Sequence, residues 1–182
     1  MRTLSFFVGI IALLSILSFS DKVVESLFWE NHEKLSWHDY KGHTDHNHPH
    51  IAAITASSII RFTGCNDKGE LIYKITASFE KNQSWVRQES RTPRVLSHEQ
   101  LHFDITELYA RKLRKELRDI TFMCDEEEAF HKYVDRRLVY WQADQLQYDF
   151  DTDFSNNSPQ QVDWEMKVKN ALEELSAYAE LD

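Results

Sequence analysis

Residues 98–102 have the sequence HEQLH, which places a glutamate and two histidines within five residues. Side chains four residues apart lie on one face of a helix, so His98 and His102 could bind one metal ion together. Zinc accepts such a nitrogen pair together with a third protein ligand and a water molecule. Zinc also lowers the pKa of that water, and Glu99 could take the proton as general base. The motif therefore predicts zinc-dependent hydrolysis and leaves the third ligand to be found.

The helix that carries these residues is predicted to run from Thr92 to about Arg118. Thr92 suits the N-cap and Pro93 suits the first helical position. Apolar residues then follow at roughly helical spacing: Val95, Leu96, Leu101, Ile105, Leu108, Tyr109, Leu113 and Leu117. The alternative to a metal site is an ordinary core helix whose histidines are satisfied by hydrogen bonds.

A β-hairpin is predicted before this helix. Residues 52–64 form its first strand, a turn follows at residues 66–69, and residues 69–86 form the partner strand. Apolar and polar residues alternate along the partner, which is the period of a half-buried strand.

Two more helices are predicted after the HEQLH helix. The second begins at Asp125 as N-cap, with Glu128 completing a capping box. The third begins at Ser158, where Pro159 suits the first turn and Gln161 the capping box, and it continues to the end of the chain. The intervening residues are expected to form a loop.

The order of strands followed by helices predicts an α+β fold, with a small antiparallel sheet followed by three helices. The length of 182 residues suits one domain, expected over residues 21–182.

Residues 1–20 combine a basic start, an apolar stretch and small residues before Asp21, which is typical of a signal peptide cleaved near Ser20. The alternative is an uncleaved membrane anchor. Either interpretation predicts export, to the periplasm or outside the cell.

The net charge and the two cysteines bear on the type of protein and on its compartment. The net charge of −9 argues against nucleic-acid binding, which relies on a positive field. Cys65 and Cys124 form either a disulfide, as suits an exported protein, or two buried free thiols.

Several blocks of the sequence resemble a bacterial family named domain of unknown function 922, or DUF922. Its members are described as secreted zinc-dependent proteases on the strength of their motif. The resemblance covers about residues 35–175. Its blocks are LSWHDYKG, AAITASSI, SWV, LSHEQLHFDITELYARKLRKEL, YDFDTDF and QQVDW.

The resemblance implies a zincin-like fold with the HExxH motif on the first long helix, with His98 and His102 as zinc ligands and Glu99 as general base. It also draws attention to Asp104, Tyr148, Asp149 and Thr152, which match recurring family positions. Members of the family often carry a histidine two residues after that threonine, as a candidate third ligand. Phenylalanine occupies this position here, as Phe154, and cannot bind zinc.

Carboxylates are the remaining candidates for the third ligand. Asp104 lies about 200° around the helix from His102, so it is expected to pair with Arg111 or to anchor the helix instead. Glu107 is similarly misplaced and suits a surface ion pair with Arg111, four residues later.

Residues 148–157 are expected to form a loop able to fold back to the histidines, and they contain Asp149, Asp151 and Asp153. Asp149 is chosen as zinc ligand because it matches the family pattern. The alternative is that it accepts a hydrogen bond from a ligating histidine. Tyr148 is expected to donate a hydrogen bond to a developing oxyanion, or else to pack as an aromatic residue at a helix end.

Two other segments have functional interpretations. Residues 43–50 include His43, His46, His48 and His50, and form either a metal-binding tract or an exposed loop. Residues 52–60 carry small side chains, and a peptide could pair with this strand if it lies at a sheet edge.

The sequence thus favours an exported zinc-dependent peptidase or related hydrolase acting on a peptide or protein substrate. In this hypothesis zinc-bound water attacks an amide and Glu99 is the general base. The alternative is a non-catalytic exported domain that binds metal or another protein.

Overall fold

The computed structural model describes residues 25–29 and 34–179. Its central sheet has the order β1-β4-β3, formed by Ser26–Phe28, Leu71–Glu80 and Ser57–Cys65. A separate pair of strands consists of β2, Ala53–Ile54, and β5, Trp85–Val86. The helices are α1, Pro93–Leu117, α2, Glu127–Thr152, and α3, Ser158–Glu174, with short 3-10 turns at Gln88–Ser90, Cys124–Glu126 and Ser176–Tyr178. The predicted signal peptide and its cleavage position lie outside the described residues.

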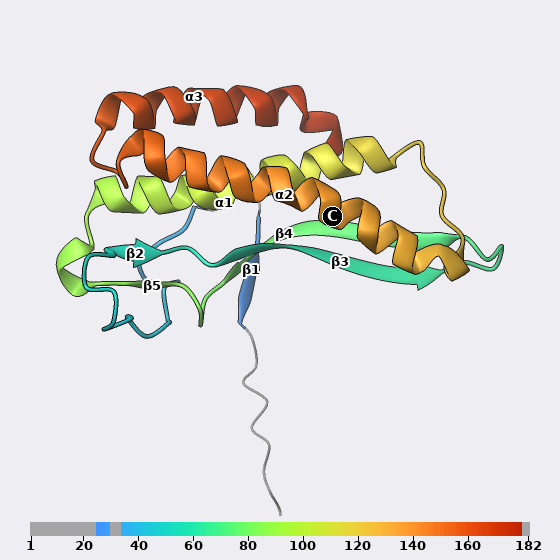
Figure 1. Ribbon diagram of the computed structural model, residues 1–182, viewed down its shortest axis with the longest axis horizontal. Helices are drawn as coiled ribbons and strands as arrows, with labels where there is room; N and C mark the ends of the chain where they lie inside the picture. The colour runs from blue at the N-terminus through green and yellow to red at the C-terminus, as the bar shows by residue number, and fades with distance from the viewer. Residues whose placement is uncertain (1–24, 30–33, 180–182) are drawn as a thin grey trace, which may run out of the picture.

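The three helices cover one face of the sheet (Figure 1). Helix α1 packs on β3 and β4, and α2 and α3 both pack against α1 and against each other. This arrangement confirms the predicted α+β class with a small antiparallel sheet followed by three helices. No helix in the described part of the chain is both long enough and apolar enough to span a membrane.

The predicted hairpin is confirmed, since β3 and β4 pair antiparallel from Ser57↔Phe79 to Cys65↔Leu71. Residues 75–80 of β4 are all buried. Both faces of this half of the strand are therefore covered, and the prediction of a half-buried strand is wrong there.

The first strand was expected to be continuous over residues 52–64, which is wrong. It is interrupted because β2 pairs with β5, whereas β3 pairs with β4. Strand β1, which was not predicted, pairs with the other edge of β4 and makes β4 the central strand.

Helix α1 begins as predicted. The Thr92 side chain accepts a hydrogen bond from the backbone N–H of Val95, and Pro93 occupies the first turn. Helix α2 begins one residue later than predicted, with Glu126 and not Asp125 at the N-cap position, because a 3-10 turn containing Asp125 precedes it. The carboxylate of Glu126 in that turn accepts a hydrogen bond from the backbone N–H of Met123, the residue that precedes the turn.

The predicted loop at residues 148–157 is wrong for its first half, because α2 continues to Thr152. Burial of Tyr148 and Thr152 stabilises these last turns, and the helix ends where residues 153–155 adopt positive φ angles.

Asn157, rather than Ser158, caps α3, because its side chain accepts a hydrogen bond from the backbone N–H of Gln160. Helix α3 ends at Glu174 instead of continuing to the end of the chain.

Cys65 and Cys124 form a disulfide, which decides between the two alternatives for these residues. It joins the end of β3 to the turn before α2, across a sequence separation of 59 residues.

The expected surface ion pair between Glu107 and Arg111 is real but buried, so the surface assignment was wrong. Glu107 is 1% exposed and Arg111 is 2% exposed. The carboxylate of Glu107 accepts hydrogen bonds from Arg111 and Arg114, each at 2.9 Å. The guanidiniums also donate to the backbone oxygens of Leu172 and Tyr178. This network fastens the C-terminal segment to α1.

Replacing Glu107 with glutamine should lower the free energy of unfolding by about 3–5 kcal/mol, because two guanidiniums would lose a buried counter-charge. Urea denaturation measures this change. The control is Glu116→Gln on the same helix, since Glu116 is exposed and binds Arg137 at the surface; its effect should stay below about 1 kcal/mol. Equal effects in the two variants would contradict the assigned role of the buried network.

Candidate metal centre

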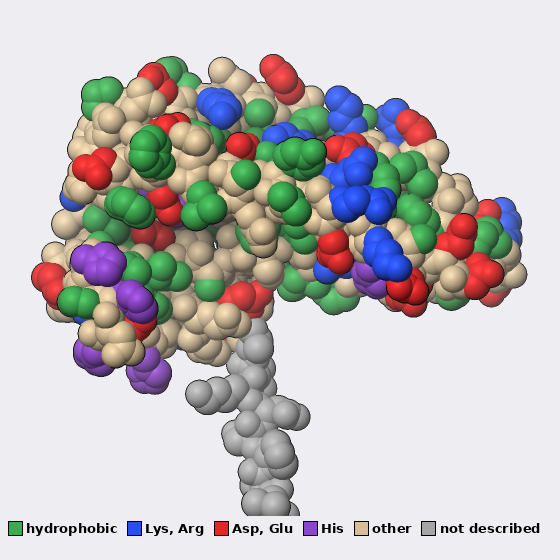
Figure 2. Space-filling view, in the orientation of Figure 1, with side chains coloured by type: hydrophobic (Ala, Val, Ile, Leu, Met, Phe, Trp, Pro, Cys, Tyr) green, Lys and Arg blue, Asp and Glu red, His purple; other side chains and the backbone are tan. Residues whose placement is uncertain are grey.

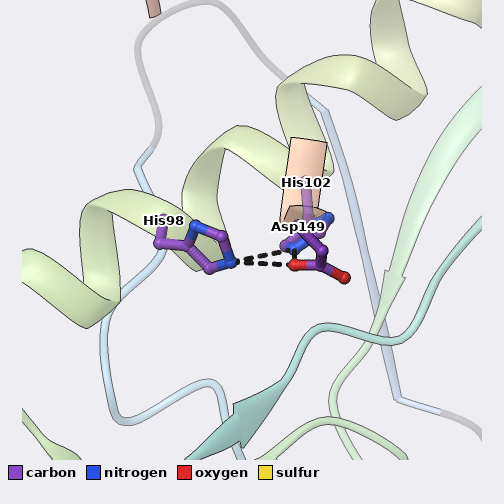
Figure 3. Close-up of side chains that lie close together, drawn as sticks. All are labelled: His98, His102 and Asp149. Carbon is purple, nitrogen blue, oxygen red and sulfur yellow. Dashed lines mark hydrogen bonds and ion pairs between the residues drawn. The ribbon is translucent and has the colours of Figure 1, made fainter. Parts of the chain in front are cut away.

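Three side chains from two helices meet at one point (Figure 3). The Nε2 atoms of His98 and His102 on α1 lie 3.2 Å apart. Each is 3.1 Å from the Oδ1 atom of Asp149 on α2. These three residues are the one group of potential metal ligands of this kind that the described part of the chain brings together. The structure thus unites the predicted ligands, with Asp149 on a helix and not on a loop.

Packing between α1 and α2 explains why Asp149 reaches the histidines. Tyr148 is fully buried, and its ring stacks on that of His98 with 4.6 Å between the ring centroids. It also meets the ring of His102 edge-on at 4.9 Å. Because Asp149 follows Tyr148 on the helix, this packing directs the next side chain toward the two Nε2 atoms.

Two glutamines orient the histidine rings. The Nδ1 atom of His102 lies 2.6 Å from the Oε1 atom of Gln145, whose amide nitrogen donates to the carbonyl of His102 and to the hydroxyl of Thr106. The Nδ1 atom of His98 lies 3.2 Å from the Oε1 atom of Gln161. Each Nδ1 therefore donates to an amide oxygen, which leaves each Nε2 to face the ligand point.

The charges of the cluster are coupled. Burial lowers the pKa of His102, but the hydrogen bond to Asp149 and the charges of Glu99 and Asp149 outweigh it and raise the pKa overall. Burial raises the pKa of Asp149, but hydrogen bonds from His102 and His98 outweigh that and hold the pKa well below its usual range. The carboxylate is therefore ionised at neutral pH, as a metal ligand must be.

Glu99 is buried beside this cluster without full compensation. It is 5% exposed, and its Oε2 atom has no hydrogen-bond partner among the described residues. Its charge contributes to raising the pKa values of His102 and Tyr148, which places it close to both. Such an orphaned buried oxygen is costly and indicates a missing partner.

The residues fit a zinc ion. Neighbouring ligands of tetrahedral zinc with bonds of about 2.0 Å lie about 3.3 Å apart, close to the 3.1 Å and 3.2 Å separations observed here. Two imidazoles and one carboxylate also form a known catalytic donor set for zinc, which keeps a fourth position for water. A water there would offer a partner to the orphaned oxygen of Glu99.

The backbone of Glu99 is tied to the sheet region. The hydroxyl of Thr55, between β2 and β3, donates to the carbonyl of Glu99 at 3.2 Å. The hydroxyls of Tyr40 and Thr55 lie 2.8 Å apart, so Tyr40 donates to Thr55 in turn. This chain of hydrogen bonds holds the β2–β3 link against the turn of α1 that carries Glu99.

The geometry of Tyr148 favours the packing alternative over the oxyanion role. Its hydroxyl donates to the Oε1 atom of Gln161 at 2.7 Å and also lies 3.2 Å from the carbonyl oxygen of His98. The hydroxyl is therefore engaged inside the protein, where it fixes His98 relative to α3.

The other carboxylates lie outside the cluster. Asp104 anchors α1, as predicted, by accepting hydrogen bonds from Trp29 and Gln100. Asp151 accepts from the indole N–H of Trp164.

The remaining candidates near the end of α2 are also accounted for. Asp153 ends the helix in a left-handed conformation, and Phe154 is 68% exposed. The hydroxyl of the buried Thr152 donates to the carbonyl of Tyr148, within the helix. The four histidines of residues 43–50 are exposed and do not belong to the cluster.

Sequence reasoning missed Gln145 and Gln161 as supports for the ligands. The sequence pattern predicts a capping-box role for Gln161, whereas its side chain is hydrogen bonded to His98, Tyr148 and Glu165. Gln145 lies four residues before Asp149, so helical spacing placed it on the same face of α2. Neither glutamine carries a signal of its own, because the partner histidines lie on another helix.

Replacing Gln145 with leucine should weaken zinc binding about 10- to 100-fold, because the His102 ring would lose the acceptor that orients it. The measurement is zinc affinity by competition with a chromophoric chelator. Gln142→Leu is the matched control, since Gln142 is an exposed glutamine on the same helix. Unchanged affinity in the Gln145 variant would show that this hydrogen bond does not support the site.

Comparison with known proteins adds one match. Residues 70–156 match the model of a family described as bacterial protein of unknown function (DUF922). This segment contains α1 and α2 and therefore all three residues of the cluster. Searches of curated proteins and of solved structures gave no match.

Proposed function

Because the chain belongs to the DUF922 family of bacterial proteins, whose function is unknown, we propose that it is an exported zinc-dependent peptidase or related amide hydrolase with a zincin-like site. His98, His102 and Asp149 hold the zinc ion, and Glu99 is the general base. The observation that carries this proposal is the buried Oε2 atom of Glu99, which has no hydrogen-bond partner in the described part of the chain and lies beside a cluster of three candidate ligands of the right size.

Bound zinc supplies a water molecule of lowered pKa and polarises a substrate carbonyl. Glu99 is suited to accept the proton from that water and to pass it to the leaving amine, because it is buried and one of its oxygens has no hydrogen-bond partner among the residues that the structure describes. Gln145 and Gln161 keep the Nε2 atoms directed at the ligand point. Tyr148 keeps His98 in place and excludes water from the inner side of the site.

The sheet offers a surface on which an extended substrate can align. β3 is an edge strand of the described sheet, and the β2–β3 link is hydrogen bonded to the turn that carries Glu99. The backbone N–H of Glu80 donates to the carbonyl of Ala56, so alternation along the strand directs the backbone groups of Ser57 and Ile59 outward. A peptide could pair with these groups as an added strand.

Export is supported by the Cys65–Cys124 disulfide, because such bonds persist in oxidising compartments.

The competing proposal is a non-catalytic exported domain that uses the same cluster only to bind metal. The two proposals differ in the role of Glu99, which is not needed for ligation.

Asp149→Asn should reduce zinc affinity at least about tenfold, because it replaces the charged third ligand with a neutral amide. Metal content after dialysis, measured by atomic emission, tests this. Asp151→Asn is the control, two residues away on the same helix, and should retain about one zinc per chain. Full zinc content in the Asp149 variant would contradict its role as ligand.

Glu99→Gln should keep the zinc and lose at least about 100-fold in turnover, because general-base catalysis contributes about that much. Cleavage of an unfolded protein substrate, followed together with metal content, separates the two effects. His98→Ala should lose both metal and activity. Turnover that survives Glu99→Gln, or wild-type protein that binds zinc without any hydrolysis, would contradict the catalytic proposal.

A further inference from the structure

The outer face of α2 carries an exposed apolar stripe. Val139, Leu146 and Phe150 are 61%, 71% and 79% exposed. Their spacing of seven and four residues places them along one face of the helix. Such a stripe normally packs against a core, so a helix that leaves it in solvent indicates a binding surface.

Helical geometry places this stripe beside the metal cluster. At about 100° per residue, Leu146 and Phe150 lie about 60° and 100° around α2 from Asp149, both in the same direction. Tyr148 lies about 100° in the opposite direction and is fully buried. The stripe is therefore on the open side of Asp149, away from the core.

The same side of α2 faces β3. Asp135 lies about 40° from Asp149 in the direction of Leu146, and it binds Arg61 of β3 at 2.5 Å. From this ion pair α2 continues toward Asp149 while diverging from the strand (Figure 1). The space between β3 and this face of α2 is here called the wedge, and the Arg61–Asp135 ion pair closes one end of it.

Side chains from three elements form the floor of this wedge. The hydroxyl of Thr106 on α1 lies 2.7 Å from the hydroxyl of Ser57 on β3. It also accepts hydrogen bonds from Trp141 and Gln145 on α2, each at 3.2 Å. Figure 2 shows a hollow in this face, with hydrophobic side chains along its border on the helix side.

We propose that Leu146 and Phe150, here called the apolar rim, determine substrate specificity by binding an apolar side chain of an extended peptide beside the bond to be cleaved. This inference rests on the proposed peptidase function and names its substrate class. Two observations favour a peptide as occupant: the rim continues directly from Asp149, and the outward backbone groups of β3 lie across the wedge. The ion pair at the closed end limits how far the peptide extends in that direction.

The test uses the full chain with Glu99→Gln and bound zinc, so that peptides bind without being cut. The probes are two fluorescein-labelled ten-residue peptides, one with leucine and phenylalanine at its centre and one with serine at those positions. Fluorescence anisotropy gives Kd for each. Leu146→Ser/Phe150→Ser should bind the apolar peptide at least about tenfold more weakly, with zinc content unchanged.

Val162→Ser/Met166→Ser is the matched control. These two residues also lie four apart on a helix, are 50% and 53% exposed, and belong to α3. This variant should bind the apolar peptide as the parent does. Equal Kd values for the two peptides, or an unchanged Kd in the rim variant, would overturn the inference. A dimer that depends on the rim and binds no peptide would also overturn it, by assigning the stripe to contact between copies.

Failure of the rim inference can be distinguished from failure of the peptidase proposal. If the chain without the Glu99 substitution cleaves peptides with the same KM whether or not the rim is substituted, the function stands and the rim inference fails. If it never cleaves, but binding depends on the rim and on apolar residues in the peptide, the peptidase proposal fails and the rim remains a peptide-binding surface.

Discussion

The packing of Tyr148 between α1 and α3 is the constraint on which the candidate metal centre depends. The ring stacks on His98, and the hydroxyl is held by Gln161 and lies within hydrogen-bonding distance of the carbonyl of His98. One aromatic residue therefore fixes the relative positions of all three helices where the ligands meet. Asp149 is placed by this contact, since a shift of α2 along α1 would carry the carboxylate away from both Nε2 atoms.

The opposite half of α1 is fixed by charge instead of by aromatic packing. Glu107 neutralises two guanidiniums inside the protein, and these reach the carbonyls of Leu172 and Tyr178. Breaking one member of such a network leaves a buried charge, which makes the arrangement sensitive to single substitutions. Helix α1 is thus held at two places, and the candidate metal centre lies at the first of them, where Tyr148 packs on His98.

Glu99 differs from Glu107 although both are buried carboxylates on α1. Glu107 has its charge compensated by arginines, whereas the Oε2 atom of Glu99 has no partner within residues 25–29 and 34–179. A fold optimised only for stability would not retain that oxygen, because burying it unpaired costs free energy. The contrast separates a carboxylate that supports the structure from one whose charge the described residues leave uncompensated, as the proposed general base requires.

Much of the fold was predictable because its signals are local. The α1 start, the hairpin and the order of strands and helices follow from capping residues, alternation and turn residues within short windows. Strand β1 and the extension of α2 to Thr152 were not predictable in this way. They are stabilised by contacts with distant elements, such as the pairing of Ser26 with Glu80 and the burial of Tyr148 against α1.

The sequence by itself determined that His98, Glu99 and His102 lie close together on one helix, and that any third ligand for a metal ion would have to come from elsewhere. Only the tertiary structure decided that Asp149 is the carboxylate that meets them, and that Glu107 and Arg111 are buried together. The physical reason is that helical spacing relates residues on one element. The distance between two helices is decided by the side chains packed between them.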